Sequence, residues 1–208
     1  FTIIVSQPDA DALSKALAIA EQLKQTGIPN FYGPQRFGHN MQNIPRAFAL
    51  LAKGKKARKD AFMVSVVQSA LFNIWLQKRM DAGDFHRLLA GDIVKKTDTG
   101  GMFSVEDLAA ESLRFDDGAI VYTGPIFGFK MKSATQTAGE RETALLDEFG
   151  LTAEDFRPLR APGSRREAIL NLTDLTITEA PQGVRFSFTL PAGAYATTVL
   201  REFIRPDD

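Results

Sequence analysis

The sequence contains no cysteine, and it has only two histidines and one tryptophan among its 208 residues. Without cysteine the chain can form neither disulfides nor thiolate metal sites, which suits a cytoplasmic protein without requiring one. Two histidines, His39 and His86, are too few for a histidine-rich metal centre. No apolar run approaches the roughly 20 residues that a membrane-spanning helix needs. The sequence therefore gives no sign of a disulfide-linked, metal-centred or membrane-spanning protein.

Excess charge of either sign is also lacking, because 25 basic residues balance 25 acidic ones. An overall positive field is absent, so any nucleic-acid site must be a local patch. The densest basic run is Lys53 to Lys59, which contains Lys55, Lys56 and Arg58. This run is either a phosphate-contacting patch or a solvated turn between two helices.

Phenylalanine is plentiful, with 16 residues against three tyrosines, and this favours dry interior packing.

The length suits one large domain or two small ones. Helical spacing of apolar residues predicts helices over 11–25 and 60–80, with Asp60 as an N-cap. Strands are expected at 119–122, before a turn at Thr123, and at 170–178 and 184–190 around a turn at Pro181. The pattern therefore predicts a mixed α+β fold.

The chain opens on the apolar run Phe1 to Val5 (FTIIV), which predicts a buried strand. A domain rarely begins inside a buried strand. We therefore expect that another segment preceded Phe1 in the parent protein.

Three segments resemble the TruD family of tRNA pseudouridine synthases, in the order the family has them. The first is Asn30 to Gly38 (NFYGPQRFG), the second is Ser65 to Asn73 with Arg79 beyond it, and the third is Ser187 to Glu202. Weaker similarities are Gly91-Asp92, Thr123-Gly-Pro with Gly128, and Pro162-Gly-Ser-Arg-Arg. The nine-residue motif is far more specific than a lone glycine-rich loop.

The resemblance implies an enzyme that isomerises uridine to pseudouridine, at position thirteen of tRNA in bacterial members, without a metal or organic cofactor. It implies a pseudouridine synthase core of mixed sheet and helices that is interrupted by a family-specific α/β insertion domain. On this chain the core would comprise residues 1–56 and 170–208, and the insertion would comprise residues 57–169. The implied partner is tRNA in the cytoplasm, with no membrane; a monomer is favoured.

Three residues are candidates for the chemistry around the target base, which must leave the RNA stack to be reached. Tyr195 is the candidate platform for the flipped base, or it is a buried tyrosine at a strand–helix junction. Asn30 suits the edge of a uracil or a ribose hydroxyl, or it caps a turn. Tyr32 follows Phe31 where the family usually has Tyr and then Phe, so the aromatic order is reversed.

The remaining candidates would contact RNA. Arg36 can hold a phosphate or a carboxylate through two hydrogen bonds, and a salt bridge that locks the loop is an alternative. The full set of expected RNA-binding residues is Phe31, Gln35, Arg36, Phe37, Lys55, Lys56, Arg58 and Arg201.

The family's catalytic Asp lies in a Gly-Leu-Lys-Asp-like motif, and this chain contains no such motif. Asp9 and Asp11 lie in a polar turn of the wrong type, and Asp60, Asp92 and Asp174 lie in the wrong context. We therefore expect this chain alone to be inactive, either as a fragment that needs the missing N-terminal part of the same protein or as an RNA-binding relative without chemistry. A third possibility, a small-molecule enzyme with a phosphate loop at 30–40, is disfavoured because Gln35, Arg36 and Phe37 are bulky.

Overall fold

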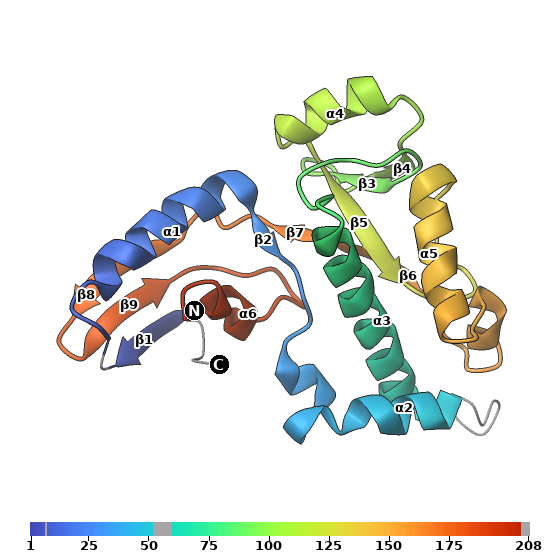
Figure 1. Ribbon diagram of the computed structural model, residues 1–208, viewed down its shortest axis with the longest axis horizontal. Coiled ribbons are helices and arrows are strands. Elements are labelled where there is room, and N and C mark those ends of the chain that lie inside the picture. Colours follow the sequence, from blue (N-terminus) through green and yellow to red (C-terminus); the bar gives the residue numbers. More distant parts are fainter. Residues whose placement is uncertain (7, 52–59, 205–208) are drawn as a thin grey trace. The chain divides into compact units, whose positions relative to one another are not determined.

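The computed structural model describes residues 1–6, 8–51 and 60–204. The chain combines helices with antiparallel strands (Figure 1), which confirms the α+β prediction. The chain divides into two compact units. The first comprises residues 1–31 together with the chain from Ile169 onward, and the second comprises residues 32–168.

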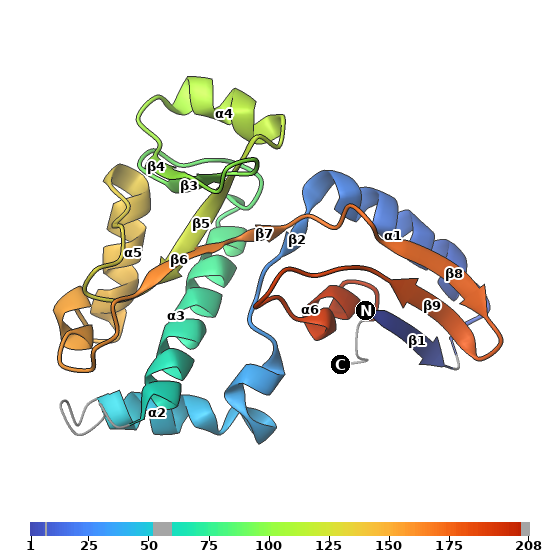
Figure 2. The same cartoon turned by 180° about the vertical axis from the view of Figure 1, so that it is seen from behind.

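The first unit is a small antiparallel sheet with two helices. Its strands run in the order β1-β9-β8, and a separate short pair joins β2 to β7. Helix α1 runs along β8 (Figures 1 and 2). The elements are β1 (Thr2–Ser6), α1 (Ala12–Thr26), β2 (Ile28–Pro29), β7 (Ile169–Leu170), β8 (Thr176–Ala180), β9 (Gly183–Ser187) and α6 (Ala196–Arg201).

Alternation along β9 builds the core of this unit. Val184 and Phe186 are buried, whereas Arg185 between them is exposed. These side chains pack with Ala16 and Ala20 of α1 and with residues of α6. The predicted first helix is confirmed, and it ends where Gly27 adopts a positive φ of 69°.

Two strand predictions for this unit are wrong in detail. The first strand was expected to be buried, but Ile4 is 38% exposed because side chains alternate along β1, so that Ile3 and Val5 pack against the core and Ile4 lies on the opposite face. The strand expected over 170–178 is two elements, β7 and β8, which belong to different sheets. The hairpin that follows, β8 to β9, is confirmed.

The second unit contains a four-stranded antiparallel sheet in the order β4-β3-β5-β6, with a long helix packed on it. Short 3-10 helices are named η. The elements are η1 (Pro34–Phe37), η2 (His39–Met41), α2 (Asn43–Leu51), α3 (Ala61–Asp81), β3 (Ile93–Lys96), β4 (Met102–Ser104), α4 (Leu108–Asp116), β5 (Ile120–Ile126), α5 (Gln136–Glu148), η4 (Ala153–Phe156) and β6 (Ser164–Glu167).

Helix α3 is the central element of this unit (Figure 1), and it contacts α2, β5, α5 and η1. It is apolar on several faces, with Val66, Leu71 and Leu76 fully buried, as a helix surrounded by protein requires. Asp60 begins the helix as predicted, because its side chain accepts a 3.0 Å hydrogen bond from the backbone N–H of Met63.

Strand β5 is longer than expected, and the turn predicted at Thr123 is wrong. The strand continues through Pro125 to Ile126, where its partner is β6. The pairing of β5 with β3 ends at Tyr122, so Pro125 takes no part in that ladder and its missing N–H breaks no bond there.

The packing division falls at 31/32 and 168/169. Which residues form the catalytic core and which the insertion domain is a functional assignment, and it stays a prediction. In the described part of the chain, no helix is both long and apolar enough to cross a membrane.

Candidate functional site

The motif Asn30 to Gly38 spans the division between the two units. Asn30 and Phe31 belong to the first unit, and the segment from Tyr32 onward belongs to the second.

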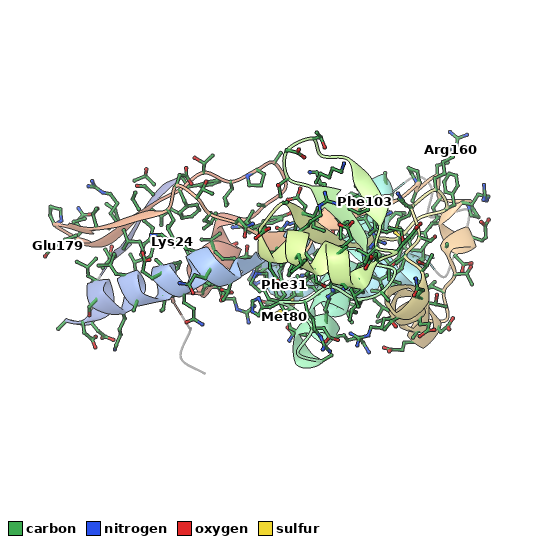
Figure 3. All side chains as sticks on the ribbon, turned by 90° about the horizontal axis from the view of Figure 1, so that it is seen from above. Lys24, Phe31, Met80, Phe103, Arg160 and Glu179 are labelled. Atoms are coloured by element: carbon green, nitrogen blue, oxygen red, sulfur yellow. The ribbon has the colours of Figure 1, made fainter. Side chains whose placement is uncertain are left out.

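Asn30 follows β2 directly and is 7% exposed. The next residue, Phe31, is half-buried and is labelled in Figure 3. Its N–H donates a 2.9 Å hydrogen bond to the carbonyl of Pro29, which makes a tight turn around Asn30. Asn30 is thus an amide held in a constrained, largely buried segment.

Tyr195 occupies the N-cap position of α6 in an extended conformation, at the strand–helix junction expected from the sequence. Its carbonyl accepts hydrogen bonds from the N–H of Thr198 at 3.1 Å and from the hydroxyl of Thr198 at 2.7 Å. Its side chain is half-buried, whereas Arg201, one and a half turns later, is exposed. The start of the helix therefore fixes the backbone from which the Tyr195 ring projects.

Tyr32 is held through both its backbone and its ring. Asn73 of α3 donates its amide to the Tyr32 carbonyl at 2.9 Å and accepts from the Tyr32 N–H at 2.8 Å. The Tyr32 ring meets the Phe72 ring edge-on, with centroids 5.7 Å apart and an interplanar angle of 86°. The guanidinium of Arg166 lies 4.1 Å from the centre of the same ring.

Arg36 anchors the next part of the motif to α3. Its guanidinium donates to the hydroxyls of Ser65 at 2.6 Å and Ser69 at 3.2 Å, and it lies 5.3 Å from the Phe62 ring centre. Among the described residues, this arginine thus locks the loop through neutral hydroxyls rather than through the salt bridge that the sequence suggested. Ser65 and Ser69 belong to the second matched segment, so these two segments are in direct contact.

The other motif residues differ in exposure. Gln35 is exposed on η1, whereas Phe37 is 3% exposed and its ring belongs to the core. Gly38 has a φ of 76°, and a side chain there would meet the Asn43 amide at 2.7 Å. The predicted basic contacts Lys55, Lys56 and Arg58 lie outside the described residues.

Sequence reasoning missed Asn73 and Arg166 as neighbours of Tyr32. Asn73 is the last residue of the second matched segment, and Arg166 is the last residue of the Pro162-Gly-Ser-Arg-Arg similarity. Both residues therefore lie in segments that resemble the family, but their spacing along the chain does not reveal that they contact Tyr32.

Several weaker similarities have structural roles. Arg79 forms a buried, two-bond ion pair with Asp92, and its guanidinium lies 3.7 Å from the Tyr122 ring centre. Burial raises the pKa of Tyr122. Gly128 and Gly163 touch so closely that a Cβ on Gly128 would lie 2.2 Å from the Gly163 nitrogen. These motifs hold the second unit together.

Four of the aspartates set aside above are engaged locally. Asp11 pairs with Lys15, Asp60 caps α3, Asp92 pairs with Arg79, and Asp174 accepts from the Thr189 N–H at 3.0 Å. Within residues 1–6, 8–51 and 60–204, no cluster of three or more acidic or histidine side chains is arranged to hold a metal ion.

Comparison with known proteins extends over almost the whole chain. The family model for tRNA pseudouridine synthase D (TruD) matches residues 1–47 and 56–203. The tRNA pseudouridine synthase D of Anaeromyxobacter dehalogenans (strain 2CP-C) is 40% identical over 218 residues, which cover 100% of this chain and 62% of that protein. A Thermus thermophilus protein of the same name is 39% identical over 210 residues, which cover 99% of this chain and 57% of that protein.

This chain thus spans about 60% of the length of these relatives. A crystal structure from Methanosarcina mazei, assigned as tRNA pseudouridine synthase D (TruD), has the same fold. Its TM-score is 0.78 at 23% identity, with coverage of 100% of this chain and 68% of that one. The chain belongs to the TruD family of tRNA pseudouridine synthases.

Proposed function

We propose that this chain is part of an enzyme that isomerises a uridine in tRNA to pseudouridine, and that the target is the uridine at position thirteen. The observation that carries the proposal is the match to one family over nearly the whole chain, including the motif Asn30 to Gly38. The names of the relatives identify tRNA as their substrate.

Three side chains have proposed roles around the target base. The Asn30 amide hydrogen-bonds the uracil edge or a ribose hydroxyl, since an amide both donates and accepts. The Tyr195 ring supports the flipped base by stacking. Tyr32 occupies the second aromatic position of the motif, and its tight surroundings support a role that needs a fixed ring.

The proposed RNA contacts are made mainly by cations and exposed polar groups. Arg36 and Arg201 are the described cations of this group, and Lys55, Lys56 and Arg58 would add charge to a protein whose net charge is zero. Gln35 and Phe31 complete the contacts, while the buried Phe37 shapes the loop that carries them.

The reacting carboxylate is the group that this chain does not supply. The family's Gly-Leu-Lys-Asp-like motif is absent, and Asp11, Asp60, Asp92 and Asp174 serve local structure. We therefore propose that residues 1–56 and 170–208 contribute base- and RNA-binding groups to the catalytic core, with 57–169 as the insertion domain. The enzyme would work as a cytoplasmic monomer without a cofactor.

The test compares the full-length protein with the 208-residue chain on an unmodified tRNA transcript, with pseudouridine measured by mass spectrometry. We expect product from the full-length protein, none from the chain alone, and none on a transcript with cytidine at position thirteen. Product from the chain alone would refute the missing-nucleophile proposal. Tight tRNA binding without product from the full-length protein would instead favour an RNA-binding relative without chemistry.

A further inference from the structure

We infer that Asn73 and Arg166 are positioning residues that fix Tyr32 for catalysis, one through its backbone and the other through its ring. The inference rests on the proposed function, because Tyr32 is a candidate catalytic residue of that function. All the residues involved belong to the second unit.

Asn73 holds the backbone of Tyr32 in the manner of a neighbouring strand. A single side-chain amide satisfies both the N–H and the carbonyl of Tyr32, at 2.8 and 2.9 Å. Asn73 lies in the middle of α3, next to the fully buried Phe72 and one turn before the fully buried Leu76. A group mounted on such a packed helix is more accurately placed than one on a loop.

Arg166 holds the ring of Tyr32 from a second element. Its guanidinium lies 4.1 Å from the Tyr32 ring centre and 5.4 Å from the Phe72 ring centre, both within cation–π range. Phe72 meets the Tyr32 ring at 86°, so a cation and an aromatic ring constrain it together. The ring therefore cannot turn without losing one of these contacts.

The strand β6 directs Arg166 towards Tyr32. Arg166 lies opposite Gly124 of β5 in the strand pairing. Gly124 has no room for a side chain, because a Cβ on it would lie 2.3 Å from the Trp75 ring. The preceding residue, Arg165, points to the opposite face of the strand and forms a two-bond ion pair with the buried Glu142. Two adjacent arginines thus have different tasks, and the one at 166 serves the motif loop.

The first experiment measures single-turnover pseudouridine formation and tRNA affinity with variants of the full-length protein. A displacement of about 1 Å at a catalytic group can cost up to 10²-fold in rate. We expect Asn73→Leu and Arg166→Met each to slow pseudouridine formation from bound tRNA at least about tenfold. The Kd for tRNA should change by less than about threefold. The matched control is Gln68→Leu, which removes a buried amide on the same helix that donates to the Phe127 carbonyl at 2.7 Å. We expect that control to lower the melting temperature but not the rate.

A double-mutant cycle separates positioning from general support of the fold. If Arg166 acts through the Tyr32 ring, Arg166→Met should cause no further loss of rate in a Tyr32→Ala background. An undiminished loss in that background would overturn the role of Arg166. Variants with wild-type rates in an active enzyme would overturn the inference and leave the proposed function standing.

Amide hydrogen exchange of the full chain tests the Asn73 clamp without reference to activity. The Tyr32 N–H should be protected in the wild type and exchange at least about tenfold faster in Asn73→Leu, with the Met63 N–H at the start of α3 unchanged. If Asn73→Leu does not fold, Asn73→Ser serves, because its shorter side chain cannot span both bonds. Equal protection in wild type and variant would overturn the clamp, and an inactive wild type would refute the proposed function instead.

Discussion

The guanidinium of Arg79 faces the carboxylate of Asp92 through two hydrogen bonds of 2.8 and 2.7 Å, and the two side chains are 3% and 1% exposed. The same guanidinium donates to the carbonyls of Asp84 at 3.1 Å and Arg87 at 2.8 Å. One side chain at the end of α3 therefore ties the helix to the segment before β3.

Removing one partner of this pair should destabilise the second unit strongly. Arg79→Ala leaves the Asp92 charge buried without its cation, and we expect a loss of about 3–5 kcal/mol in the free energy of unfolding. The control is Lys78→Ala, since Lys78 and its partner Glu148 are about half exposed, and an exposed pair contributes at most about 1 kcal/mol. Urea unfolding of the full chain measures both, and equal losses would contradict the argument.

The contact between Gly128 and Gly163 should tolerate no side chain. Gly128→Ala would place a Cβ 2.2 Å from backbone, which cannot move aside as a flexible side chain can. We expect a loss of about 1–3 kcal/mol or more, seen as a lower melting temperature. Gly101→Ala is the control, because its Cβ would meet no atom closer than 3.6 Å. A Gly128→Ala variant as stable as the wild type would show that the segments around Gly128 and Gly163 can move apart.

Acid should weaken the second unit through Asp84. Burial opposes ionisation of this carboxyl, but the guanidiniums of Arg141 and Arg87 lower its pKa below the ordinary value of 3.8. Its contribution to stability is therefore present above about pH 4 and is lost as the pH falls through the lowered folded value. We expect Asp84→Asn to flatten the dependence of unfolding free energy on pH below about 4, measured by urea titrations. If the unfolding free energy of the variant depends on pH as that of the wild type does, other groups cause the acid sensitivity.

The ring of Tyr195, and not its hydroxyl, should support activity. Loss of base–aromatic stacking costs about 1–3 kcal/mol per base. Tyr195→Ala in the full-length protein should therefore reduce kcat/KM for tRNA about 10- to 100-fold, whereas Tyr195→Phe should retain most of it. Product formation on a tRNA transcript provides the measurement. If the two variants are equally impaired, the hydroxyl is the functional group.

Sequence alone predicted the elements whose signals are local. The helix predicted over 11–25, which the structure shows as α1 (Ala12–Thr26), follows from apolar spacing and from Gly27. The long helix α3 follows from its periodicity and the Asp60 cap. The strand through Pro125 was missed because proline usually ends a strand. Only the pairing of β5 with β3 and β6 shows that the N–H which proline lacks is not needed in the ladder with β3. The exposure of Ile4 likewise depends on which face of the sheet packs against the core.

Part of the candidate site was likewise predictable from the sequence and part was not. The motif was recognisable as a run of residue types, and Arg36 anchors its part in the second unit to α3. The partners of Tyr32 were not predictable, because Asn73 is 41 residues away and Arg166 is farther still. Contacts between distant segments arise from packing, which leaves no periodic trace in the sequence.

The two arginines of β6 make the number of residues within this strand a constraint. Arg165 and Arg166 alternate between a buried carboxylate and the Tyr32 ring solely because of the strand's pleat. Inserting or deleting one residue within β6 would exchange their faces, so the ion pair and the aromatic contact would be lost together. Related proteins should therefore vary in length at the loops of this unit and keep the count of residues within β6 fixed.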